Sequence, residues 1–202
     1  MSTLASMSVG LGKRPALLVI DATRGFTDPA SPAGCEGGAA LLQIAKLLAA
    51  FRARGLPVFF TSTSYAHEHE ARVFREKLPA LNALATGGRW AEIDPRVLPR
   101  DGEAVLRKTV PSGFFDSPLR GWFAAVDSDA TVVCGFSTSG CVRASAVDAL
   151  QCNLRVTVAR DACGDRDAEA HAYNLRDLAL KTGDVCDSAD IIERLGFAIA
   201  QT

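Results

Sequence analysis

The sequence predicts an α/β fold built around a parallel sheet. Apolar, strand-like runs alternate with segments of helical periodicity along the chain, which is the signature of repeated β-α-β units. With 202 residues, 48% hydrophobic and 22% charged, the chain has the size and composition of one globular domain with a substantial core. We therefore expect a single domain over residues 1–202, with residues 1–12 as a flexible N-terminal segment.

Two strands and one long helix are predicted in the first third of the chain. The aliphatic run Ala16–Ile20 is typical of a buried strand, and it leads directly to Asp21. After a loop rich in glycine and proline, residues 39–54 have a helical pattern that ends at Gly55. The aromatic and β-branched run Pro57–Thr61 is the second strand.

The rest of the chain alternates in the same way after a polar, irregular middle region. Ser117 followed by Pro118 is a typical helix start, and Gly183 in a left-handed conformation is expected to end the last predicted helix. Further strands are predicted over residues 104–107, 131–134, 155–159 and 184–186. Further helices are predicted over residues 69–78, 117–126, 142–150 and 167–182.

Charge and composition exclude several classes of partner. The 22 basic and 23 acidic side chains give a formal charge of −1, which is no signature of nucleic-acid or membrane binding. No apolar run approaches the roughly 20 residues that span a bilayer, and the N-terminus lacks a secretory pattern. The six cysteines are scattered without a C-x-x-C motif, so we expect reduced thiols and a cytoplasmic protein.

The segment Val132–Ser145 contains the cysteine with the most reactive setting. An apolar run ends in small and hydroxyl-bearing residues, and Cys141 then opens a helix-like segment. A thiol at a helix start lies near unpaired N–H groups and the positive end of the dipole, which predicts a lowered pKa. The alternative is a buried structural cysteine, as we expect for Cys134 within the strand itself.

Three chemically complementary side chains follow three predicted strands. Asp21 follows the first strand, Lys108 the third and Cys141 the fourth. Ligands of such sheets bind outside the carboxyl ends of the strands, so we expect these side chains to converge there. The thiolate is a nucleophile, Lys108 supplies a positive charge, and Asp21 accepts a proton and returns it to a leaving amine.

Four segments of the chain resemble the isochorismatase-like cysteine hydrolase superfamily. They are Leu18–Pro29, Arg107–Phe115, Ser137–Ser145 and Asp161–Arg166. Within the superfamily the chain is most similar to the N-carbamoylsarcosine amidohydrolases, with the maleamate amidohydrolases as near kin. The resemblance implies a three-layer αβα sandwich with a six-stranded, mostly parallel sheet.

The resemblance also implies a catalytic triad of Asp21, Lys108 and Cys141. By the same likeness, the backbone N–H groups of Ser137 and Cys141 form an oxyanion hole, and the Phe136–Ser137 peptide bond is cis.

The same likeness names residues for substrate binding. Residues matching Thr138 and Arg166 hold a substrate carboxylate in the carbamoylsarcosine enzymes, and a guanidinium suits that group because it donates two parallel hydrogen bonds. Phe26, Phe115 and Trp90 are candidates to wall the ligand, with core packing as the alternative for each.

The expected function is therefore metal-free hydrolysis of a terminal carbamoyl or amide C–N bond in a small carboxylate-bearing substrate. Maleamate hydrolysis is the alternative with the same residues. Isochorismate cleavage would leave Cys141 without a role. A silent or redox-responsive thiol scaffold is the alternative from another class. The expected partners are a small-molecule substrate and further copies of the chain, as a dimer or tetramer.

We expect no cofactor and no metal. Nicotinamidases of the superfamily bind a metal through an aspartate and two histidines after the second strand, and the Asp-x-His pattern is missing here. His67 and His69 form an H-x-H pair, which is more typical of a solvated loop than of a metal site. His171, in the last predicted helix, is interpreted as a surface residue.

Overall fold

A single six-stranded sheet forms the centre of the molecule. The structure is a computed structural model, and it describes residues 5–199. The strands run in the order β3-β2-β1-β4-β5-β6, and every neighbouring pair is parallel. Their bounds are β1 (Pro15–Ile20), β2 (Val58–Thr63), β3 (Ala104–Lys108), β4 (Ala130–Phe136), β5 (Arg155–Gly164) and β6 (Asp184–Cys186).

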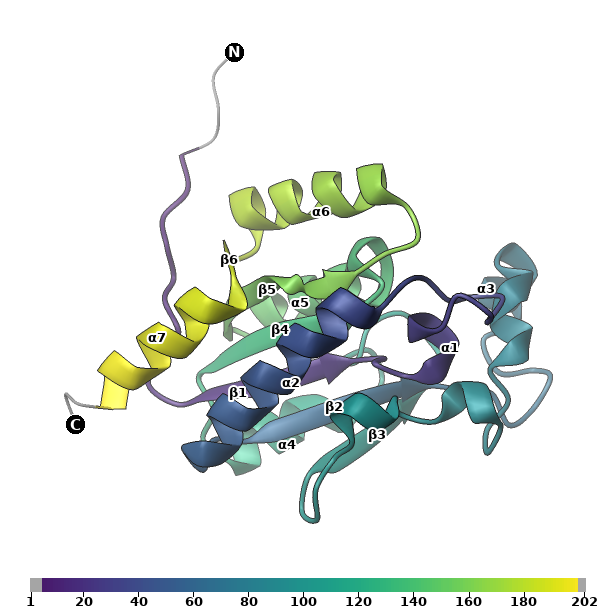
Figure 1. Cartoon of the computed structure of the whole chain (residues 1–202), viewed down its shortest axis with the longest axis horizontal. Coiled ribbons are helices and arrows are strands. Elements are labelled where there is room, and N and C mark those ends of the chain that lie inside the picture. Colours follow the sequence, from purple (N-terminus) through teal and green to yellow (C-terminus); the bar gives the residue numbers. More distant parts are fainter. Residues whose placement is uncertain (1–4, 200–202) are drawn as a thin grey trace.

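Helices cover both faces of this sheet, which confirms the three-layer α/β fold (Figure 1). One face packs against α2 and α7, and the opposite face packs against α4, α5 and α6. The helices are α1 (Arg24–Thr27), α2 (Gly38–Ala53), α3 (Arg72–Lys77), α4 (Leu119–Ala125), α5 (Arg143–Gln151), α6 (Ala168–Lys181) and α7 (Ser188–Ile199). None of the helices in the described part of the chain is long and apolar enough to cross a membrane.

The two central strands are fully buried and approach each other closely at their carboxyl ends. Every residue of β1 and of β4 is buried, as expected for strands covered by helices on both faces. Ile20 pairs with Gly135, whose φ is 118°. A Cβ at Gly135 would lie 1.9 Å from the Ile20 carbonyl oxygen, so only glycine fits. This close approach sets Asp21 beside the residues that follow β4.

The predicted elements differ from the observed ones at several ends and in two helices that the sequence did not predict. The helix expected over 69–78 is confined to α3, and the short α1 and the C-terminal α7 were not predicted. Gly183 does not adopt a left-handed conformation: a Cβ there would lie 2.2 Å from the Val156 carbonyl oxygen. Close packing against β5, rather than a helix stop, therefore explains this glycine.

The N-terminal segment is attached to the sheet over part of its length. The Ser8 hydroxyl donates to the Asp184 carboxylate at 2.7 Å, and the N–H groups of Val9 and Gly10 donate to the same side chain. Leu11 is buried. Residues 8–11 are thus tied to β6 and the core; of the segment predicted to be flexible, residues 1–4 lie outside the described chain.

Candidate active site

The first group of the site is a buried carboxylate at the carboxyl end of β1. Asp21 is 0% exposed and has a left-handed backbone with φ 45°. Its Oδ1 accepts a hydrogen bond from the Thr61 hydroxyl at 2.9 Å, and its Oδ2 accepts one from Thr63 at 2.9 Å. Both threonines belong to β2, so the neighbouring strand fixes the orientation of the carboxylate.

The second group is the ammonium of Lys108, at the end of β3. Its Nζ lies 2.7 Å from Asp21 Oδ2 and donates to the Thr63 hydroxyl at 2.7 Å and to the Val110 carbonyl at 3.1 Å. Burial lowers the pKa of Lys108, but the Asp21 carboxylate and the Cys141 sulfur more than reverse this effect and raise it above its usual value. Lys108 is therefore a permanent cation in the site.

The third group is the thiol of Cys141, 8% exposed, which lies in a π-helical turn over Thr138–Val142. Burial raises the pKa of this thiol to about 12; Lys108 lowers it and Asp21 raises it. The expectation of a lowered pKa is therefore wrong for this structure. The turn places the thiol against the core. There the loss of hydration raises the pKa of the thiol by more than the Lys108 charge lowers it.

A backbone N–H without a partner lies at the start of the turn that carries the thiol. Among residues 5–199, the N–H of Ser137 makes no hydrogen bond. The Ser137 carbonyl instead accepts from Gly140 and Val142, which fixes the turn. The Phe136–Ser137 peptide bond is cis. The geometry offers a backbone N–H at the start of the same turn that carries the sulfur, as an oxyanion site requires.

Thr138 and Arg166 lie on adjacent segments, but their polar groups are engaged within the protein. The Thr138 hydroxyl is 3.2 Å from the Gly164 carbonyl oxygen and 2.8 Å from His171 Nδ1. His171, expected at the surface, is thus half-buried and in contact with the turn. The exposed Arg166 donates to the Ala33 carbonyl oxygen, across to the loop that precedes α2.

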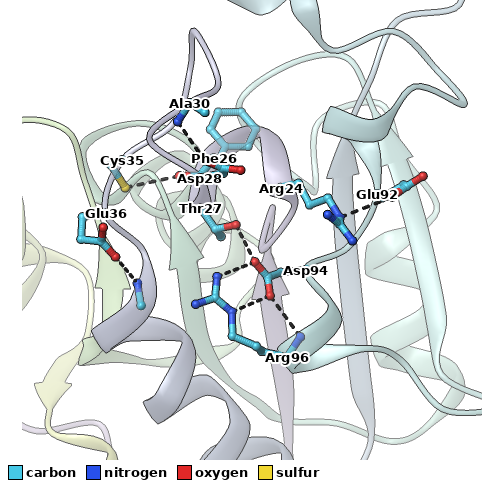
Figure 2. A network of polar contacts seen from close by, with 11 residues as sticks. Arg24, Phe26, Thr27, Asp28, Ala30, Cys35, Glu36, Glu92, Asp94 and Arg96 are labelled. Carbon is cyan, nitrogen blue, oxygen red and sulfur yellow. Dashed lines mark hydrogen bonds and ion pairs between the residues drawn. The ribbon is translucent and has the colours of Figure 1, made fainter.

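The segment carrying Phe26 is held by an ionic network centred on the buried carboxylate of Asp94 (Figure 2). Asp94 accepts from the Thr27 hydroxyl at 2.8 Å and from the Arg96 guanidinium at 2.8 and 2.7 Å. Burial raises the pKa of Asp94, but the bonds from Arg96 outweigh it and leave the pKa at about 2. Phe26 is buried in the same core cluster as Ala22, and the Thr27–Asp94 bond ties the short helix α1 that carries it to this network.

The other aromatic candidates occupy different environments. Phe115 is 65% exposed on the surface, and Trp90 is half-buried under the Arg89 guanidinium at 4.0 Å. Phe115 therefore does not pack into the buried site, because its ring faces solvent in this chain. Of the three candidates, only Phe26 is buried near the end of β1.

His67 and His69 lie on an exposed segment after β2, with their rings stacked at a centroid distance of 5.4 Å. Within residues 5–199, no group of three or more histidine, cysteine, aspartate or glutamate side chains is arranged to hold a metal ion.

Known proteins resemble this chain over most of its length. The Isochorismatase domain family matches residues 15–190. A maleamate amidohydrolase of Pseudomonas putida is 40% identical over 190 residues, which cover 93% of this chain and 89% of that protein. An N-carbamoylsarcosine amidase of Arthrobacter is 31% identical over 194 residues, covering 93% of this chain and 73% of that protein.

Solved structures show the same fold. A cysteine hydrolase from Pseudomonas syringae superposes with a TM-score of 0.89 at 23% identity, covering 98% of this chain and 99% of that one. An N-carbamoylsarcosine amidase from Thermoplasma acidophilum superposes with a TM-score of 0.71 at 29% identity, covering 87% and 96%. The chain belongs to the isochorismatase family. It is a hydrolase of that family, and its similar relatives include amidohydrolases.

Proposed function

We propose that this protein hydrolyses the terminal amide or carbamoyl C–N bond of a small carboxylate-bearing substrate and releases ammonia. The observation that carries the proposal is the contact between Asp21 and Lys108 at 2.7 Å, in a buried cluster that shifts the pKa of the Cys141 thiol. A nucleophile, a proton acceptor and a fixed cation therefore meet at one edge of the sheet. This is the set of groups that acyl transfer to sulfur requires.

In the proposed mechanism the thiol proton moves to Asp21 as the sulfur attacks the amide carbon. The raised pKa of Cys141 means that the resting thiol keeps its proton at neutral pH, so this transfer accompanies the attack. The N–H groups of Ser137 and Cys141 stabilise the oxyanion. Asp21 then gives the proton to the nitrogen, the C–N bond breaks, and ammonia leaves.

Water completes the cycle. It attacks the thioester carbon while Asp21 accepts one of its protons. The C–S bond then breaks, the sulfur regains a proton, and the carboxylic or carbamic acid product leaves. Lys108 keeps its charge throughout and stabilises the negative charge as it passes between carboxylate and sulfur.

The substrate carboxylate is proposed to bind between Thr138 and Arg166. The contact of the Ser139 N–H with Asp165 at 2.7 Å joins the two segments that carry them. Binding there requires Arg166 to exchange the Ala33 carbonyl for the carboxylate, and Phe26 supplies apolar surface nearby. Maleamate is the first candidate substrate, because the relative with 40% identity acts on it; N-carbamoylsarcosine is the second.

The test is ammonia release from maleamate, N-carbamoylsarcosine, other N-carbamoyl amino acids, biuret and nicotinamide, with and without a chelator. We expect chelator-insensitive turnover of a carboxylate-bearing substrate, which Cys141→Ala abolishes. Cys152→Ala, the same change at a half-buried thiol at the end of α5, is the matched control and should retain activity. Arg166→Ala should lower the rate of hydrolysis of acidic substrates more than that of neutral amides.

Two results would contradict the proposal. Turnover retained by Cys141→Ala removes the thiol from the mechanism. Absence of turnover with every substrate favours a thiol scaffold instead. A homo-oligomer and a cytoplasmic location remain predictions, the first to be checked by sedimentation and the second by fractionation of the source cells.

A further inference from the structure

Tyr65 occupies a central place at the edge of the sheet where the candidate site lies. Strand β2 is between β1, which ends at Asp21, and β3, which ends at Lys108. Thr63, the last residue of β2, contacts both of these side chains. Tyr65 follows two residues later, so its backbone emerges between the carboxylate and the ammonium.

The ring of Tyr65 is fixed in place. Its backbone N–H donates to the Leu84 carbonyl, and its carbonyl accepts from the Thr86 N–H, both at 2.9 Å. The Arg75 guanidinium stacks 4.7 Å from the ring centroid, and the residue is 5% exposed. The two hydrogen bonds fix the backbone of Tyr65, and burial under the Arg75 cation leaves the ring little freedom to turn its hydroxyl elsewhere.

The hydroxyl itself has no hydrogen-bond partner among the described residues. Buried tyrosine hydroxyls usually find one, so an unsatisfied hydroxyl needs an explanation. Burial raises the pKa of Tyr65, and Cys141 and Asp21 raise it further, in that order. The hydroxyl therefore lies within electrostatic reach of both groups and stays protonated, as a neutral donor and acceptor.

The NH₂ group of a bound primary amide needs hydrogen-bond acceptors that the groups of the proposed mechanism do not provide. In the proposed mechanism the oxygen of the amide faces the backbone N–H groups, its carbon faces the Cys141 sulfur, and its nitrogen receives a proton from Asp21. The two N–H bonds of that nitrogen still need acceptors. On the basis of the proposed function, we propose that the Tyr65 hydroxyl accepts a hydrogen bond from one of these N–H groups and thereby orients the scissile C–N bond between Cys141 and Asp21.

The test compares an amide with the methyl ester of the same acid, because the ester forms the same thioester but has no N–H. Tyr65→Phe keeps the ring and removes the hydroxyl. We expect kcat/KM to fall about tenfold on the amide, equivalent to about 1.4 kcal/mol, and less than twofold on the ester. Tyr173→Phe, at the other tyrosine of the chain, 65% exposed on α6, should change neither rate.

Thermal unfolding of the same variants separates a positioning role from a structural one. Because the hydroxyl has no partner in the protein, Tyr65→Phe should keep or raise the melting temperature. Equal losses on amide and ester, or no loss on the amide, would overturn the proposal. Equal losses would indicate that the hydroxyl acts on the thiolate or stabilises the fold. Wild-type protein inactive on both compounds would instead refute the proposed function and the inference with it.

Discussion

The buried pair of Asp21 and Lys108 allows a prediction that does not depend on knowing the substrate. At the observed 2.7 Å, the attraction between the charges is about 6 kcal/mol for an effective dielectric constant of about 20. Removing both charges from water costs several kcal/mol each, so the pair contributes little net stability. Removing only one partner leaves the other charge buried and uncompensated, at a cost of about 3–5 kcal/mol.

A double-mutant cycle measures this effect. Asp21→Asn and Lys108→Met should each lower the free energy of unfolding by about 3–5 kcal/mol, and the double variant should lose clearly less than the sum. Urea unfolding followed by circular dichroism gives the four values. The control is the pair Arg160–Asp187, which has the same 2.7 Å separation with side chains 49% and 43% exposed. Its coupling should be about 0.2–1 kcal/mol.

The result that refutes the reasoning is additivity. If the Asp21 and Lys108 losses add within about 0.5 kcal/mol, the two charges do not interact in the folded protein. Coupling equal to that of the exposed pair would show that water reaches the site. Either outcome would remove the buried ion pair on which the proposed mechanism depends.

Two further predictions concern titratable groups. The pKa of Asp94 is lowered to about 2, so the stability that this group contributes should be present above pH ~4 and be lost as the pH falls to ~2. Because the side chain of its partner Arg96 is 53% exposed, solvent screening reduces this contribution to about 1 kcal/mol. Urea unfolding across this range should show a smaller decline for Asp94→Asn than for the wild type, and equal declines would contradict the prediction. With the pKa of Cys141 at about 12, inactivation by iodoacetamide should accelerate about tenfold per pH unit between pH 7 and 9. A pH–rate curve with its midpoint near pH 8.5, as for a free thiol, would show that the thiol is not buried as described.

The sequence predicted the strand-end residues of the site because their signals are local. Asp21 and Lys108 each follow a predicted strand, and parallel strands bring such positions to one edge. The thiol pKa was misjudged because burial depends on segments far away in the chain. The hydroxyls of Thr61 and Thr63 were missed as partners of Asp21, although alternating hydroxyl residues at the end of an otherwise apolar strand are the signal that marks them.

Other features could not be predicted from the sequence because they depend on strand order. The role proposed for Tyr65 rests on the position of β2 between β1 and β3, and nothing in the local sequence distinguishes this residue from a core aromatic. His171 was expected at the surface because its neighbours on α6 are polar, but one face of that helix contacts the Thr138 turn. A surface prediction from composition fails where a short turn covers a polar helix.

Because the resting thiol is protonated, Cys141 depends on Asp21 and Lys108 for its reactivity. A thiol whose pKa lies near 12 is a weak nucleophile, so the carboxylate beside it must take the proton during attack. Asp21 can do so because the Thr61 and Thr63 hydroxyls and Lys108 hold it in one orientation. In the proposed mechanism, the same carboxylate then carries the proton to the nitrogen that leaves. Reactivity in this site thus depends on a substrate that completes the proton path, which is consistent with a hydrolase and disfavours a general thiol sensor.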